Sequence, residues 1–376
     1  MLVVAGNPSP QGFRAWWYDR PTLGAFHEGA MTTLTTRDPN LPPAYSDSLD
    51  ALALAPLWTA LHALLPNERA TRATPHVWPW GEVRPRLLDA ARLVPLEQAE
   101  RRVLVLRNPG LGGAYAITST LFAGFQIILP GETAPSHHHT PAALRLVVEG
   151  QGAYTTVEGV KCPMEVGDLI ITPPMRWHDH GHQGAEPVIW LDGLDIPLVR
   201  SLDAAWASKM RPAHPPVTSA DSSADEFTAA GVVPRASRYP QTGYPQIRWP
   251  WRTVRAALER LAATAPPEAS VTLRYVDPTT GGAPLPTMGA EAHWLRPGER
   301  TRGERRTTSR IFHVIEGRGQ SRVGERLLAW ERGDTFVAPP WHWLEHEHRG
   351  DGPACLFQFD DEPVLRALGL WQDDRR

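Results

Sequence analysis

The chain has 376 residues, of which 42% are hydrophobic and 21% charged, and its net charge is −3. This length suits two domains of ordinary size, and the composition is that of a globular rather than a disordered protein. The charge balance excludes a basic nucleic-acid-binding surface as the dominant feature, and no apolar run reaches the ~20 residues that cross a membrane. Two isolated cysteines, Cys162 and Cys355, and a start without signal-peptide features predict a cytoplasmic protein.

Two helical patterns precede the rest of the chain. Apolar residues recur at helical spacing over residues 51–65, after a candidate N-cap region at 46–50, and predict an amphipathic packing helix. A second helix is predicted over 87–94, where Pro95 follows as a stop signal.

From residue 101 onward the pattern changes to short β-rich runs separated by glycine and proline clusters. The predicted strands are 103–106, 122–129, 144–149, 169–172 and 188–191. Such short, evenly spaced strands are typical of a small all-β barrel or sandwich. Residues 201–248 are rich in Ala, Ser, Asp and Pro and are interpreted as a linker with some helix, and β-rich sequence returns over 271–359.

An internal repeat organises this β-rich region. LVVEGQG at 146–152 returns as HVIEGRG at 313–319, and VGDLIITPP at 166–174 returns as RGDTFVAPP at 332–340. The offset is 167 residues for the first pair and 166 for the second. Two copies of one β-module are therefore predicted. We divide the chain into an N-terminal extension (1–75), a first module (76–200), the linker (201–248) and a second module (249–376).

Histidines cluster at two places in the first module. Alternation along a strand points His137 and His139 to one face, and His178 and His180 likewise share a face. Two imidazoles from one strand and a third from another form a set of three nitrogens on one side of a metal ion. Imidazole suits iron, copper, zinc and nickel, so this pattern predicts a metal site without naming the metal.

The second module provides an internal control for this interpretation. At the repeat offset, the positions of His137, His139, His178 and Arg145 hold Glu304, Arg306, Leu344 and Phe312. The glycine and proline framework is kept while the histidine set is lost. If these histidines were needed for the fold, both modules would have them. Because only the first module does, its histidines are predicted to bind a metal.

The spacing of these residues also carries a family resemblance. Gly131-x5-His137-x-His139 and, later, Gly167-x5-Pro173-x-Met175-x2-His178 resemble the two motifs of the cupin superfamily. Most metal cupins add a glutamate ligand, and here that position is Ala143. A three-histidine cupin is similar to the gentisate 1,2-dioxygenase family, with its salicylate and 1-hydroxy-2-naphthoate relatives, over about four fifths of the chain. This implies an all-β fold of two tandem cupin domains (double-stranded β-helices, or jelly rolls) with N-terminal and linker helices.

The resemblance implies roles for individual residues. The family's Fe(II) ligands match His137, His139 and His178, and its arginines for the substrate carboxylate match Arg101 and Arg145. The other candidate catalytic or substrate-binding residues are Gln126, His180, Asp192 and Phe122. Phe122 stands where many members have Trp or Tyr, so a hydrogen-bond donor near the substrate is missing.

The implied reaction is an extradiol-type cleavage of the aromatic ring of gentisate or a related 5-substituted salicylate. The ring would open between the carboxyl- and hydroxyl-bearing carbons, and both atoms of O2 would enter the product. Three neutral histidines leave one face of Fe(II) open for the substrate and dioxygen, and arginine forks match a carboxylate. The partners implied are a small aromatic hydroxy acid and O2, in a homotetramer.

Three alternatives remain open at this point. A relative specific for 1-hydroxy-2-naphthoate is separated by turnover on a substrate panel. A non-catalytic metal- or ligand-binding cupin would consume no oxygen with any hydroxybenzoate. A zinc- or manganese-dependent isomerase on the same fold would be distinguished by metal analysis.

Overall fold

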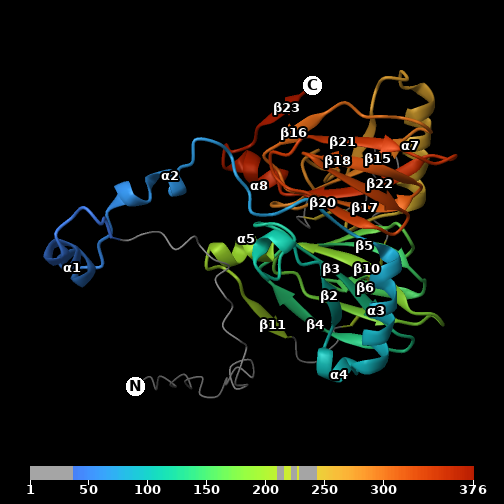
Figure 1. Ribbon diagram of the computed structural model, residues 1–376. Helices are drawn as coiled ribbons and strands as arrows, with labels where there is room; N and C mark the ends of the chain where they lie inside the picture. Colours follow the sequence, from blue (N-terminus) through green and yellow to red (C-terminus); the bar gives the residue numbers. More distant parts are fainter. Residues whose placement is uncertain (1–36, 210–215, 222–226, 228–243) are drawn as a thin grey trace, which may run out of the picture.

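The computed structural model describes residues 37–209, 216–221, 227 and 244–376 and contains two β-barrels that lie against each other (Figure 1). The first barrel has one sheet of order β13-β8-β5-β10-β3-β2 and another of order β11-β4-β9-β6-β7-β12. The strands of the first sheet are β2 (Arg102–Val105), β3 (Phe122–Ile128), β5 (Ala143–Glu149), β8 (Leu169–Thr172), β10 (Val188–Leu194) and β13 (Arg248–Trp249). Those of the other are β4 (Thr133–His139), β6 (Ala153–Val157), β7 (Val160–Pro163), β9 (His178–His182), β11 (Ala207–Lys209) and β12 (Ser219–Ala220).

The second barrel repeats this plan with sheets of order β1-β20-β17-β22-β15-β14 and β19-β18-β21-β16-β23. The first of these sheets contains β1 (His76–Trp78), β14 (Val271–Arg274), β15 (Gly289–Leu295), β17 (Arg310–Glu316), β20 (Thr335–Ala338) and β22 (Ala354–Asp360). The other contains β16 (Glu304–Arg306), β18 (Arg318–Val323), β19 (Arg326–Glu331), β21 (Leu344–His348) and β23 (Asp373–Arg375). The prediction of an all-β core with two tandem barrels is confirmed, and the five predicted strands coincide with β2, β3, β5, β8 and β10 within a few residues.

Helices lie outside the barrels. They are α1 (Pro43–Ala51), η1 (Leu57–Thr59), α2 (Leu61–Leu64), α3 (Trp80–Leu93), α4 (Leu96–Ala99), η2 (Pro109–Leu111), α5 (Ile196–Ser201), α7 (Trp251–Thr264) and α8 (Glu362–Ala367). The helix predicted over 87–94 is the second half of α3, which begins at Trp80 and ends just before Pro95, as the stop signal indicated. In the part of the chain that the structure describes, no helix combines the length and the apolarity needed to cross a bilayer.

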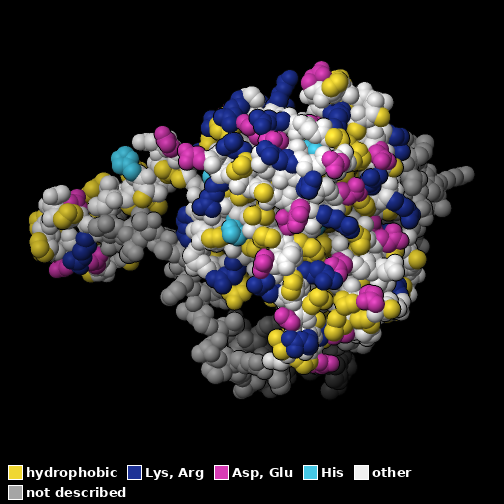
Figure 2. All heavy atoms as spheres, turned by 45° about the vertical axis from the view of Figure 1, so that its right-hand side comes forward, with side chains coloured by type: hydrophobic (Ala, Val, Ile, Leu, Met, Phe, Trp, Pro, Cys, Tyr) yellow, Lys and Arg dark blue, Asp and Glu magenta, His cyan; other side chains and the backbone are white. Residues whose placement is uncertain are grey.

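The packing helix predicted over 51–65 is wrong. Helix α1 already ends at Ala51, and only the short η1 and α2 follow. Ala53 has a left-handed backbone with φ of 54°, and Pro56 has no N–H for a helical hydrogen bond, so helical geometry is interrupted twice. The apolar residues are exposed on a segment that stands away from the barrels (Figure 2), namely Leu54, Leu57, Trp58, Leu61, Leu64 and Leu65.

The described parts of the predicted linker 201–248 complete the first barrel. Strand β11 pairs with β4, β12 pairs in parallel with β7, and β13 pairs with β8. Helix α5 begins ahead of the linker, at Ile196, and its last residue is Ser201. The further helix expected in the linker falls on residues outside the described ranges.

The two barrels exchange edge strands. Strand β1 precedes the first barrel in the chain but pairs with β20 of the second barrel. Strand β13 precedes the second barrel but pairs with β8 of the first barrel. Each barrel therefore has an edge covered by the segment that leads into the other, which removes an open sheet edge.

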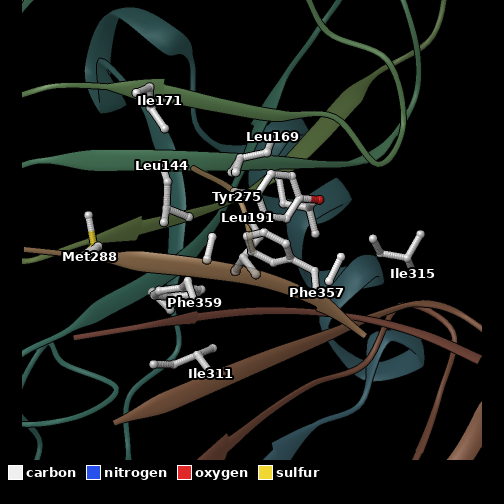
Figure 3. Close-up of a cluster of buried hydrophobic side chains, with 14 of the residues drawn as sticks. Leu144, Leu169, Ile171, Leu191, Tyr275, Met288, Ile311, Ile315, Phe357 and Phe359 are labelled. Carbon is white, nitrogen blue, oxygen red and sulfur yellow. The ribbon is translucent and has the colours of Figure 1, made fainter. Parts of the chain in front are cut away.

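A shared hydrophobic core joins the barrels. Leu144 and Leu191 of the first barrel lie in one cluster with Ile311, Phe357 and Phe359 of the second (Figure 3). Side chains alternate between the two faces of a strand. Strands β5 and β10 point Leu144 and Leu191 into this core, so the next residues along them, Arg145 and Asp192, point into the first barrel. The interior of the first barrel is thus lined by a sheet whose outer face is fixed by packing.

Candidate active site

Three histidines meet inside the first barrel. Strand β4 carries His137 and His139, and its antiparallel neighbour β9 places His178 directly opposite His137. The ring centroids are 4.1 Å apart for His137 and His178, 5.2 Å for His137 and His139, and 5.0 Å for His139 and His178. One nitrogen from each ring lies within 4.8 Å of the nitrogens of the other two, and no other such group occurs in the described part of the chain.

Hydrogen bonds fix the orientation of two of these rings. His139 Nδ1 lies 2.7 Å from the carbonyl of Pro141, and His178 Nδ1 lies 2.9 Å from the carbonyl of Arg176. Because a carbonyl only accepts, each Nδ1 carries the proton and each Nε2 has a free lone pair. His178 Nε2 is buried and has no hydrogen-bond partner among the described residues. A buried nitrogen lone pair without a hydrogen-bond donor is suited to coordinate a metal ion. The three histidines therefore fit the metal site that the sequence predicts.

Burial keeps these imidazoles neutral. Desolvation, with nearby Arg101 as the next cause, lowers the pKa of His137 to about 2. Desolvation also lowers the pKa of His139 to about 4 and that of His178 well below its ordinary value. Near neutral pH all three rings are therefore uncharged, which is the form that ligates a metal.

His138 lies between His137 and His139 but faces the other way. Its ring stacks on Trp177 with centroids 3.8 Å apart and lies 5.1 Å from Trp206. The alternation predicted from the sequence is confirmed for this strand.

Arg145 and Asp192 form a buried ion pair beside the histidines. They face each other across β5 and β10, with Arg145 Nε 3.1 Å from Asp192 Oδ1. Arg145 also donates to the hydroxyl of Thr172, and Trp190 Nε1 donates to Asp192 Oδ2 at 3.0 Å. Desolvation raises the pKa of Asp192 to about 6, and Arg145 opposes this rise. The guanidinium of Arg145 is thus held by Asp192 and Thr172, and Asp192 in turn accepts from Trp190. The sequence analysis did not single out Thr172 or Trp190.

The other predicted residues lie around this pair. Arg101 immediately precedes β2, and its Nη2 is 2.6 Å from His137 Nδ1. Gln126 of β3 is opposite Trp190 of β10, so its side chain lies on the interior face, and Phe122 at the start of β3 shares that face. The roles assigned to these residues remain predictions.

His180 follows His178 by two residues and faces the same interior. Its ring centroid is 5.8 Å from that of His178 and 5.4 Å from that of Trp190. Nδ1 lies 2.9 Å from Thr155 Oγ1, while Nε2 is buried without a hydrogen-bond partner in the described ranges. The pKa of His180 is held well below its ordinary value, mainly by desolvation and then by Arg145.

The second barrel shows what replaces the histidines. Strands β16 and β21 pair Glu304 with Leu344, as β4 and β9 pair His137 with His178. Glu304 accepts hydrogen bonds from Arg306 Nη2 and Arg310 Nη1. An internal ion-pair network therefore occupies the place of the three-histidine set.

Comparison with known proteins agrees with this geometry. A family model described as a cupin domain matches residues 124–194. A gentisate 1,2-dioxygenase of Ralstonia sp. is 43% identical over 89% of this chain and 94% of its own length. The chain belongs to the gentisate 1,2-dioxygenase family. It is accordingly an enzyme of this dioxygenase type, as the sequence resemblance predicted.

Other similar proteins are named for different substrates. A 5-aminosalicylate 1,2-dioxygenase of Comamonas sp. is 36% identical over 89% of this chain and 92% of its own. The crystal structure of a salicylate 1,2-dioxygenase from Pseudaminobacter salicylatoxidans matches with a TM-score of 0.83 at 33% identity, covering 90% of this chain and 99% of that chain. The same enzyme has also been solved as adducts with gentisate, and that structure matches with a TM-score of 0.83. Family and fold are thus settled, while the names span several aromatic acids.

Proposed function

We propose that this enzyme is an Fe(II)-dependent dioxygenase that opens the ring of gentisate or a related 5-substituted salicylate. The bond broken joins the carboxyl- and hydroxyl-bearing carbons, and both atoms of O2 enter the product. The observation that carries the proposal is the convergence of three neutral histidines and two arginines on one buried interior. His137, His139 and His178 would hold the metal, and Fe(II) bound there supplies the redox chemistry that lets dioxygen react with the ring.

The arginines support a carboxylate-bearing substrate. Arg145 is fixed by Asp192 and Thr172, so its guanidinium is oriented before substrate arrives. A guanidinium offers a rigid donor fork that matches a carboxylate. Arg145 thus orients the acid group, and Arg101 supplies a second positive charge.

His180 supports a substrate with an ionisable hydroxyl group. Its buried Nε2 has no partner in the described chain, and Thr155 can accept the Nδ1–H. In that tautomer the neutral ring presents a lone pair that accepts a hydrogen bond from the phenolic hydroxyl group. Phe122 adds an apolar wall without a donor, which offers a ring substituent no hydrogen bond there.

We also propose a homotetramer in the cytoplasm. The exposed apolar side chains of segment 45–65 support an assembly that covers them. The free, buried cysteines Cys162 and Cys355 support a reducing compartment. Light scattering at micromolar concentration tests the assembly, and a monomer would contradict it.

Oxygen uptake by anaerobically Fe(II)-loaded protein tests the reaction. The panel contains gentisate, salicylate, 5-amino-, 5-nitro- and 5-halosalicylate, and 1-hydroxy-2-naphthoate. Rapid uptake is expected with gentisate or a 5-substituted salicylate, and product mass should show both atoms of 18O2. Uptake should be lost in His178→Ala and kept in His138→Ala, because His138 lies on the opposite face of β4.

Each contrary result has a definite meaning. Fastest turnover of 1-hydroxy-2-naphthoate would overturn the proposed substrate while keeping the reaction. No uptake with any compound, in protein that retains iron, would leave a metal-binding cupin without this catalysis.

A further inference from the structure

Arg101 makes a contact that a metal ligand cannot keep. Its Nη2 lies 2.6 Å from His137 Nδ1 and 3.1 Å from the carbonyl of Pro135. A guanidinium has donors and no acceptor, so His137 Nδ1 must be the acceptor and cannot carry a proton. The proton of the neutral His137 ring is therefore on Nε2.

His137 thus differs from its two neighbours. The carbonyls of Pro141 and Arg176 hold the proton of His139 and His178 on Nδ1, which leaves Nε2 free for a metal. His137 is held by Arg101 in the opposite tautomer. Two of the three ligands are ready to coordinate through Nε2 and the third is not.

Coordination through either nitrogen of His137 requires the contact to break. If Nε2 binds the metal, the ring proton moves to Nδ1, and two donors then face each other at 2.6 Å. If Nδ1 binds the metal, the metal needs the lone pair that Arg101 uses. The Arg101 contact and metal coordination therefore exclude each other for steric and electrostatic reasons.

We propose that Arg101 and the metal ion compete for His137, so that metal binding releases the Arg101 guanidinium for the substrate carboxylate. The use of the released side chain rests on the proposed function, whereas the competition does not. Arg101 Nε is buried without a hydrogen-bond partner among the described residues, so the guanidinium has unused donor capacity. Metal binding and substrate binding are then linked through the Arg101 side chain. Because such linkage is reciprocal, each ligand raises the affinity of the protein for the other.

Arg145 provides a matched control. It carries the same charge, is more deeply buried, and lies close enough to lower the pKa of His137, His139 and His178. Its hydrogen bond and ion pair go to Thr172 and Asp192 rather than to a ligand. Arg145→Met therefore removes one positive charge near the site, and with it the partner of Asp192, without freeing His137. Arg101→Met removes one positive charge and also frees His137.

The test is the Co(II) affinity of metal-free full-length protein, measured by competition with a chromogenic chelator and by the visible absorption of bound Co(II). Arg101→Met should bind Co(II) about tenfold more tightly than the unmodified protein, the size expected from losing a charge-assisted hydrogen bond to one ligand. Arg145→Met should gain less than Arg101→Met, because it removes a neighbouring positive charge but leaves the Arg101–His137 contact in place. Arg101→Gln, whose shorter side chain withdraws the donor, should also gain affinity and serves if Arg101→Met does not fold.

Equal gains in the Arg101 and Arg145 variants would overturn the proposal, because net charge alone would then explain them. Weaker Co(II) binding in both Arg101 variants would also overturn it, since Arg101 would then support the ligand. Neither result bears on ring cleavage, which oxygen uptake by the Fe(II)-loaded unmodified protein tests separately.

Discussion

The backbone N–H of Trp80 donates a hydrogen bond to Asp334 Oδ1 at 2.7 Å, so the helix that leads into the first barrel begins on the second barrel. The converse contact joins Trp251 and Asp168 at 2.8 Å. Both acids belong to the repeated Gly-Asp dipeptide, and the neighbouring Gly167 has a φ of 88°, where a Cβ would lie 2.4 Å from the Trp251 ring. The repeated dipeptide therefore serves the joint between the barrels.

Replacement of Asp334 tests this joint. Asp334→Ala removes the acceptor that satisfies the first N–H of α3 and should lower the free energy of unfolding by about 1–2 kcal/mol. Urea denaturation followed by circular dichroism measures the effect, with the exposed Asp351→Ala as control. Because the barrels share a core, one transition is expected, and two separate transitions would contradict a single cooperative unit.

Thr172 should act on substrate affinity through Arg145. Thr172→Val is nearly isosteric but removes the hydroxyl that accepts from Arg145 Nη1. A buried donor without a partner costs roughly 1–3 kcal/mol, so KM should rise on the order of tenfold while kcat changes little. Steady-state oxygen uptake measures both constants. Thr172→Ser should restore KM, and a failure to do so would point to altered packing instead.

Glu304 should stabilise the second barrel without affecting metal content. Its carboxylate accepts from Arg306 and from the fully buried Arg310. Glu304→Gln would leave buried positive charge uncompensated and should cost roughly 3 kcal/mol in urea unfolding. The double variant Glu304→Gln with Arg310→Met should recover part of this loss. Metal analysis should give the same ion content per chain, and a lower content would place a ligand in this barrel.

His313 should make folding stability sensitive to acid. It is buried, and desolvation lowers its pKa from 6.5 to about 3. Between these pH values the unfolded chain binds a proton that the folded chain does not, so stability falls as pH drops below 6.5. From pH 7 to pH 5, His313→Gln should lose less stability than the unmodified protein, by up to ~2 kcal/mol. Urea denaturation at the two pH values checks this, and parallel losses would show that His313 contributes nothing.

The sequence by itself determined the repeat, the β-rich class and the three histidines that meet inside the first barrel. Strand alternation is a local property, so the shared face of His137 and His139 and the outward position of His138 followed from spacing alone. The loss of histidines at Glu304 and Leu344 was also readable, because the repeat gave two copies to compare. The family followed from the same motifs.

Only the tertiary structure decided which distant residues meet. Thr172, Arg145 and Asp192 meet because strands β8, β5 and β10 lie side by side, and no local pattern encodes that pairing. The apolar spacing over residues 51–65 predicted a packed helix, yet packing depends on a surface to cover, and the barrels offer none there. The Arg101–His137 contact likewise depends on how β2 and β4 are placed, and with it the tautomer of one candidate ligand. Long-range pairing sets these features, whereas periodicity reports only the faces of single elements.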